Sequence, residues 1–231
     1  LGENRATGFD LYYLGLRDRN AVFDQGSGRE VVHTYGSRIF GDTGSWHWNL
    51  EGAFQRGTFA GHRVTAWGAG GEVGYRFREA PWQPDLSLTA EVISGDSDRR
   101  DATLQTFNPL FPRGKYFGAL SPIGPRNLIH VRPTFTVQPY KDVAVSLTGA
   151  AYWRQSLADG IYAISGNLVR SGEGSAARFI GTQVELNVAW QATPELNLSV
   201  SASAFEPGAF IQDTGSARTI TMVGAMANYR F

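Results

Sequence analysis

Hydrophobic and polar positions alternate along most of the chain. In residues 46–55 the even positions carry Trp, Trp, Leu, Gly and Phe, whereas the odd positions carry His, Asn, Glu, Ala and Gln. A period of two places these sets on opposite faces of a β-strand, whereas a helix would scatter them around its circumference. The segment is therefore predicted to be a strand with one apolar face and one polar face.

The same alternation recurs throughout the chain. It is clear in residues 67–77, 86–92, 129–137, 143–153, 180–190 and 196–204, and less regular in 9–17, 31–40 and 220–231. No segment longer than a turn or two has helical periodicity. The pattern predicts an all-β, antiparallel fold with about ten strands.

The connections between these strands predict which class of β-fold this is. Short, Gly-, Pro- or Asp-containing connections at 41–44, 79–84, 139–142 and 191–195 alternate with longer ones at 19–30, 57–63, 95–127, 155–178 and 206–217. Short turns at one end and long loops at the other are typical of a transmembrane β-barrel with periplasmic turns and extracellular loops. Aromatic residues near strand ends, such as Trp46 and Tyr75 at the short turns and Trp67 and Trp153 at the long loops, fit the two membrane interfaces.

Composition excludes several functions. The formal net charge is zero, without the basic excess expected of a nucleic-acid-binding protein. The absence of Cys excludes disulfides, thiolate zinc sites and cysteine nucleophiles. The chain has no run of 18 apolar residues, and its four His residues have neither zinc spacing nor a G-x-S-x-G partner. We therefore predict no enzymatic activity and no cofactor.

If the apolar face meets lipid, the polar face lines the interior of the barrel. Arginines there would attract anions, and guanidinium groups pair well with carboxylates. The alternative is that acidic and basic side chains neutralise each other in a closed lumen. The predicted pore-lining residues are Arg38, Glu51, Gln55, Glu72, Arg76, Glu91, Arg132, Arg154, Glu185 and Arg230.

The connection at 95–127 is too long for a passive loop. Its basic residues Arg99, Arg100, Arg113 and Lys115 lie among aromatic residues and are candidates for constricting the pore. The alternative is an ordered extracellular loop. The acidic residues in 95–101 suggest calcium, but the segment lacks the Gly and the distal Glu of an EF-hand loop, so solvated loop acids are the favoured interpretation.

Several motifs occur in a characteristic order. They are RIFG at 38–41, WNLEGAFQRG at 48–57, FNPLFP at 107–112, YFG at 116–118, YWRQ at 152–155, DGIY at 159–162, RFIGT at 178–182, FEPGAFI at 205–211 and YRF at 229–231. Their order and spacing resemble the C-terminal half of the alginate export outer-membrane proteins.

This resemblance implies a barrel of about 18 strands in the outer membrane of a Gram-negative bacterium, through which an acidic exopolysaccharide leaves the cell. Residues 1–231 would then be one barrel domain or the C-terminal half of one. Membrane lipid, an anionic saccharide and the outer-membrane assembly machinery, which would read the terminal Phe231, are the implied partners. Two other hypotheses stay open: a closed structural or adhesive barrel acting through its loops, and a soluble carbohydrate-binding β-sandwich.

Overall fold

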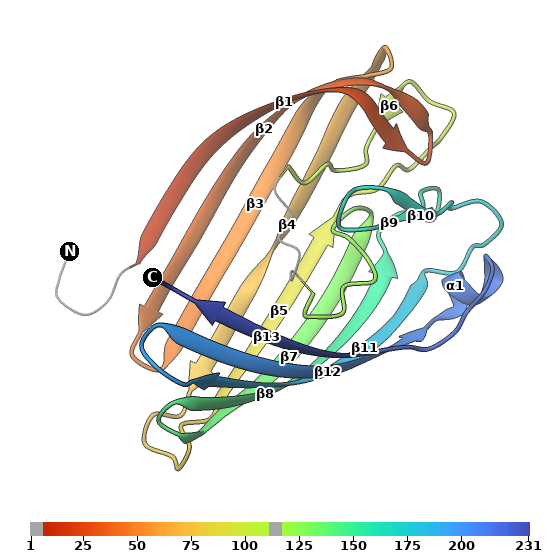
Figure 1. The fold of residues 1–231 in the computed structure, drawn as a ribbon. Helices are drawn as coiled ribbons and strands as arrows, with labels where there is room; N and C mark the ends of the chain where they lie inside the picture. The colour runs from red at the N-terminus through yellow and green to blue at the C-terminus, as the bar shows by residue number, and fades with distance from the viewer. Residues whose placement is uncertain (1–6, 111–116) are drawn as a thin grey trace.

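One large antiparallel sheet dominates the computed structural model, which describes residues 7–110 and 117–231 (Figure 1). Its ten main strands pair in chain order, and short β6 pairs in parallel with β4. The main strands are β1 (Gly8–Phe23), β2 (Gly26–Thr43), β3 (Trp46–Phe59), β4 (His62–Arg76), β5 (Asp85–Ile93), β7 (Leu128–Tyr140), β8 (Val143–Arg154), β11 (Phe179–Gln191), β12 (Leu196–Pro207) and β13 (Ile220–Tyr229). The minor elements are β6 (Thr103–Leu104), β9 (Ile161–Tyr162), β10 (Leu168–Arg170) and α1 (Ala209–Asp213).

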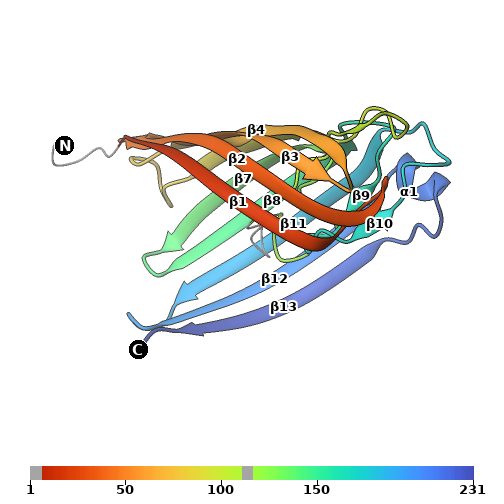
Figure 2. The same cartoon turned by 90° about the horizontal axis from the view of Figure 1, so that it is seen from above.

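The sheet curves into a trough with a convex and a concave face (Figure 2). The all-β, antiparallel prediction is confirmed. The sheet is not closed within the described residues, because β1 and β13 each pair with a single neighbour and not with each other. No helix in the described part of the chain is long and apolar enough to cross a membrane.

The prediction of long loops at 19–30 and 57–63 is wrong, because both connections are short turns between long strands. Strand β1 continues to Phe23 and β2 begins at Gly26, while β3 continues to Phe59 and β4 begins at His62. The second turn is two residues long and both have positive φ, Ala60 at 50° and Gly61 at 88°, as tight hairpins require. The period-two pattern fades in these extensions because their concave side packs on apolar loop residues instead of facing water.

Two of the other long connections fold back into the concave side of the trough. The segments between β5 and β7 and between β8 and β11 lie there, at the end opposite the short turns (Figure 1). Two groups of buried apolar residues join them to the sheet. One includes Phe117, Tyr152 and Phe205, and the other includes Phe23, Phe59 and Tyr162. We call this packed region the loop core.

The convex face is apolar, and its side chains form rows across the strands. Tyr13, Tyr35, Phe54 and Trp67 are register partners near the loop end, and Trp46, Tyr75, Leu86 and Phe135 are partners near the short turns. Along β3, the eight residues from one row to the other span about 27 Å, or about 20 Å across a membrane at the usual strand tilt. The predicted placement of aromatic residues at both ends of the strands is confirmed.

Candidate functional site on the concave face

Charged side chains of β1–β5 form paired rungs on the concave face. Arg38 lies opposite Glu51 in the register; its Nε donates to Asn49 Oδ1 at 2.6 Å, and its guanidinium lies 3.6 Å from Asp10. Glu51 in turn accepts a hydrogen bond from the Tyr12 hydroxyl. Acid and base therefore alternate across neighbouring strands, because inward positions on antiparallel strands lie directly opposite each other.

A second group of paired charges lies nearer the short turns. Arg76 Nε donates to Asp85 Oδ2 at 3.1 Å, and His47 Nε2 lies 3.1 Å from the same oxygen. The Thr89 hydroxyl donates to Glu72 Oε2 at 3.1 Å. The side chains of Arg76 and Glu72 stay 39% and 41% exposed, so this part of the concave face is polar and accessible.

The remaining predicted pore-lining residues lie in different surroundings. Glu91 lies 3.5 Å from His130 Nδ1, and Glu185 accepts hydrogen bonds from the Ala119 backbone and the Ser203 hydroxyl. Gln55 is buried and bridges the Thr34 hydroxyl to the Asn108 backbone. Three further positions are Arg132 on β7, the exposed Arg230 after β13, and Arg154 at the end of β8. The pore-lining role of the whole set stays a prediction.

Arg154 is fully buried beneath the loop between β8 and β11. Its guanidinium donates to the backbone carbonyls of Leu157, Asp159, Ser175 and Ala177 at 2.6–3.2 Å. It also lies over the Phe210 ring, 3.9 Å from the centroid. These contacts tie the ends of the loop to the sheet and to α1, which gives Arg154 a structural role within the described residues.

The four basic residues predicted to constrict the pore divide into three cases. Arg99 is fixed in the loop core, where it pairs with Asp24 at 3.1 Å and donates to the Ser171 hydroxyl at 3.2 Å. Arg100 is exposed. Arg113 and Lys115 lie outside the described residues. The structure thus ties Arg99 to the β1–β2 turn, and the constricting role of the set stays a prediction.

The acidic residues at 95–101 do not all face water, contrary to expectation. Asp96 is buried; its backbone N–H donates to Asp159 Oδ2 at 3.0 Å, and its carbonyl accepts from the Ser156 hydroxyl. Burial, reinforced by the nearby Asp159 carboxylate, raises the pKa of Asp96 to about 7. Among the described residues, no group of three or more His, Cys, Asp or Glu residues is placed to hold a metal ion.

A buried polar network in the loop core was not predicted from the sequence. Asp159 accepts hydrogen bonds from the Tyr162 hydroxyl and the Gly160 backbone, both at 2.7 Å, and burial raises its pKa. Arg126 lies over the rings of Phe23 and Tyr162 and donates to Asn108, whose amide donates to Glu30. Asn108 and Asp159 belong to two of the motifs noted above, which was the available signal.

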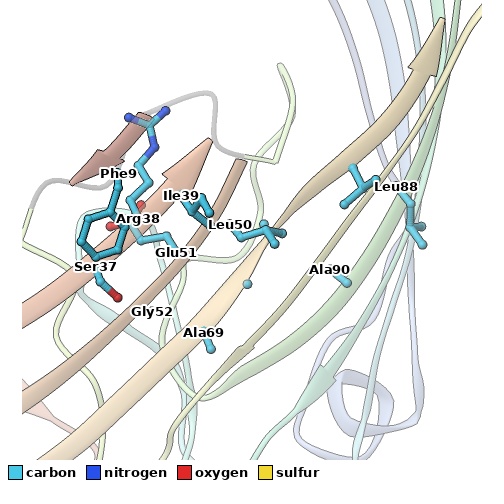
Figure 3. Close-up of a pocket in the computed structure, with 13 residues that line it drawn as sticks. Phe9, Ser37, Arg38, Ile39, Leu50, Glu51, Gly52, Ala69, Leu88 and Ala90 are labelled. Carbon is cyan, nitrogen blue, oxygen red and sulfur yellow. The ribbon is translucent and has the colours of Figure 1, made fainter. Parts of the chain in front are cut away.

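A hollow with a volume of about 550 Å³ opens on the other side of the sheet (Figure 3). Its lining comes mostly from Phe9, Ser37, Ile39, Leu50, Gly52, Ala69, Gly71, Val73, Leu88 and Ala90, which belong to the convex face, and also from Arg38, Glu51 and Gly70. Small residues at the centre, Gly52, Ala69 and Gly71, leave the space that larger neighbours surround. We call it the outer hollow. It lies on the face predicted to meet lipid.

Comparisons with known proteins identify one family. A family model described as "Alginate export" matches residues 4–224. No curated protein matches significantly. Among solved structures, one described as "NanC porin structure in rhombohedral crystal form" is similar at 8% identity and a TM-score of 0.43, covering 97% of this chain and 100% of the other. At that score the structural likeness supports no argument about function.

Proposed function

Because the chain belongs to the alginate export family, we propose that its curved sheet forms part of the wall of an outer-membrane channel. An anionic saccharide, or a smaller anionic solute, would pass passively along the concave face. The observation that carries the proposal is the contrast between the two faces. An apolar convex face bounded by aromatic rows suits lipid, while paired, accessible charges on the concave face suit an aqueous path.

The accessible charges suggest where the solute would pass. Arg38 and Arg76 are more than a third exposed on the concave face, away from the loop core. The segments of the loop core lie inside the trough at the opposite end (Figure 1). A solute would therefore travel beside β1–β4 and meet its narrowest passage next to the loops. The guanidinium groups would supply local attraction for carboxylates.

The unpaired edges of the sheet support a larger wall. A strand edge exposed to lipid leaves backbone N–H and C=O groups without partners, each at a cost of several kcal/mol. We propose that β1 and β13 are joined by further strands in the working channel. The proposal also places the channel in a Gram-negative outer membrane, with Phe231 as the signal for the assembly machinery.

Single-channel recording in a planar bilayer tests the proposal. Discrete conductance steps are expected. The double variant Arg38→Glu, Arg76→Glu should shift the reversal potential in the direction that reports a lower preference for anions over cations. The control Arg78→Glu, Lys141→Glu makes the same charge change at exposed positions near the short turns. Membrane insertion without any steps would favour the closed, loop-presenting barrel, for which the packed loop core is the supporting observation.

A further inference from the structure

A row of basic side chains lies on the convex face, just beyond the aromatic row at the loop end. In the strand register, Arg17 is opposite Val31, Val31 opposite Thr58, and Thr58 opposite Arg63. One rung closer to the aromatic row, His33 is opposite Arg56. All four basic residues are exposed. We call Arg17, His33, Arg56 and Arg63 the basic row.

Within the described residues, the basic row has no acidic counterpart on its own face. No ion pair involves any of its four members, although Arg56 lies over the Phe54 ring and His33 contacts the Tyr13 hydroxyl. Asp18 and Glu30 are register partners of each other, and the buried Glu30 side chain marks their shared face as the concave one. The Arg63 backbone N–H donates to the carbonyl of Ala102, and the neighbouring Asp101 carboxylate accepts a hydrogen bond from the Thr103 backbone N–H.

The short-turn end of the sheet differs. There, Arg78, just after β4, pairs with Asp42 at 3.5 Å, and Arg76 lies on the concave face, where it pairs with Asp85 at 3.1 Å. On the convex face of the described strands β1–β4, basic side chains are thus found at the loop-end boundary and not at the short-turn boundary. A general need for solubility would not produce this asymmetry, whereas an anionic ligand at one interface would.

The outer hollow lies nearer the short turns than the basic row, on β1–β4 and the adjoining strand β5. From Arg56 to Gly52 along β3 is four residues, or about 13 Å. Leu50 and Ala69 border the hollow on one side, and Leu88 and Ala90 border it on the other. A cationic rim, an aromatic row and an apolar hollow therefore follow one another with increasing depth. Headgroup, interface and acyl chain follow in the same order in a lipid.

We propose that β1–β4 form a binding site for an anionic membrane lipid. Its phosphate would lie against Arg17, Arg56 and Arg63, and one acyl chain would occupy the outer hollow. Guanidinium groups bind phosphate through paired N–H donors, which gives direction as well as charge attraction. The inference rests on the proposed membrane location of the convex face, and it adds a ligand on the side of the sheet facing away from the solute path.

Native mass spectrometry of the detergent-purified full chain tests this site. Phosphatidylglycerol and phosphatidylcholine with identical acyl chains are titrated separately. We expect tighter binding of phosphatidylglycerol, by about 10- to 100-fold, from three arginines near the headgroup. The variant Arg17→Gln, Arg56→Gln, Arg63→Gln should abolish this preference. The variant Arg78→Gln, Lys141→Gln, Arg218→Gln, with the same change in net charge at other exposed positions, should retain it.

A second variant tests the hollow without altering charge. A Cβ at Gly52 would meet no atom within 4 Å, so Gly52→Leu should fill the hollow without disturbing the backbone. This variant should weaken the binding of both lipids while leaving the ratio of their affinities unchanged. In the native chain, excess inorganic phosphate should not displace the bound lipid. Three results would each overturn the site: unchanged lipid binding in Gly52→Leu, displacement of the lipid by phosphate, or a phosphatidylglycerol preference that survives in Arg17→Gln, Arg56→Gln, Arg63→Gln.

The same preparations separate this inference from the proposed function. Conductance steps without any lipid preference would refute the lipid site alone. A lipid preference abolished by the arginine variant, in a protein without conductance, would refute the channel and keep the site.

Discussion

Arg154 offers the sharpest test of how the loops are held. We consider its replacement by Met, which keeps much of the side-chain volume and removes the guanidinium. In the native chain this group donates to carbonyls on both arms of the loop between β8 and β11. It also lies against the Phe210 ring. Methionine would retain the apolar contact and leave those carbonyls buried without their donor.

The magnitude follows from the number and kind of bonds lost. A hydrogen bond to a charged group contributes about 1.5–3 kcal/mol, and removing one partner of a buried charged contact typically costs about 3–5 kcal/mol. Contacts to Leu157, Asp159, Ser175 and Ala177 would be lost together, so their individual values do not add. We expect the loop to be destabilised by about 3–5 kcal/mol, with the strands of the sheet much less affected.

Limited trypsin digestion followed by mass spectrometry measures this effect. Arg170 and Arg178 are held by hydrogen bonds to Thr214 and Gln155 carbonyls, so cleavage there should be slow in the native chain and faster by about 100-fold or more in Arg154→Met. Arg100→Met, at an exposed position, is the matched control. Equal cleavage rates for Arg154→Met and the native chain would refute the view that this side chain fastens the loop.

Two further predictions concern the loop core and the sheet. Burial raises the pKa of Asp96 to about 7, so the folded chain keeps a proton that the unfolded chain releases near pH 4. The free energy of unfolding should therefore fall as pH rises from about 4 to about 7. The variant Asp96→Asn should flatten this slope when urea unfolding is measured across that pH range. Gly57→Ala would bring a Cβ to 2.0 Å from the Val31 carbonyl oxygen and should destabilise the sheet by about 1–3 kcal/mol. Gly52→Ala, whose Cβ would have no neighbour within 4 Å, should change stability by less than about 0.5 kcal/mol. Heat-dependent gel migration compares the two variants.

The strand pattern was predictable because the two faces of this sheet differ in polarity. Exposed Leu86 and Leu88 alternate with buried Ser87 and Thr89, so the period of two is preserved wherever one face stays polar and the other apolar. The ends of β1–β4 were not predictable because there the difference in polarity between the two faces is lost. Phe23, Phe59 and Val64 point inward onto loop residues, and a sequence pattern does not tell which distant segment will cover a strand.

The candidate site shows the same limit. Arg38 and Arg154 occupy equivalent polar positions in the sequence pattern, yet one stays 37% exposed beside Asp10 and the other is fully buried under a loop. Polarity predicts the face on which a side chain lies, but water and loop carbonyls satisfy a guanidinium equally well. The motif residues Asn108 and Asp159 indicated conspicuous segments without revealing that Arg126 and Tyr162 link them in one buried network.

The pairing of charges on the concave face has a consequence for transport. Conduction requires a solute to be attracted strongly enough to enter and weakly enough to leave. Arg38 and Arg76 each lie beside a carboxylate, Asp10 and Asp85, which lowers the potential that either arginine presents to a passing anion. A polymer with a carboxylate on each sugar would contact several such sites at once, and unpaired arginines would hold it by multivalent attraction. Partial neutralisation at each rung therefore favours movement along the face over retention.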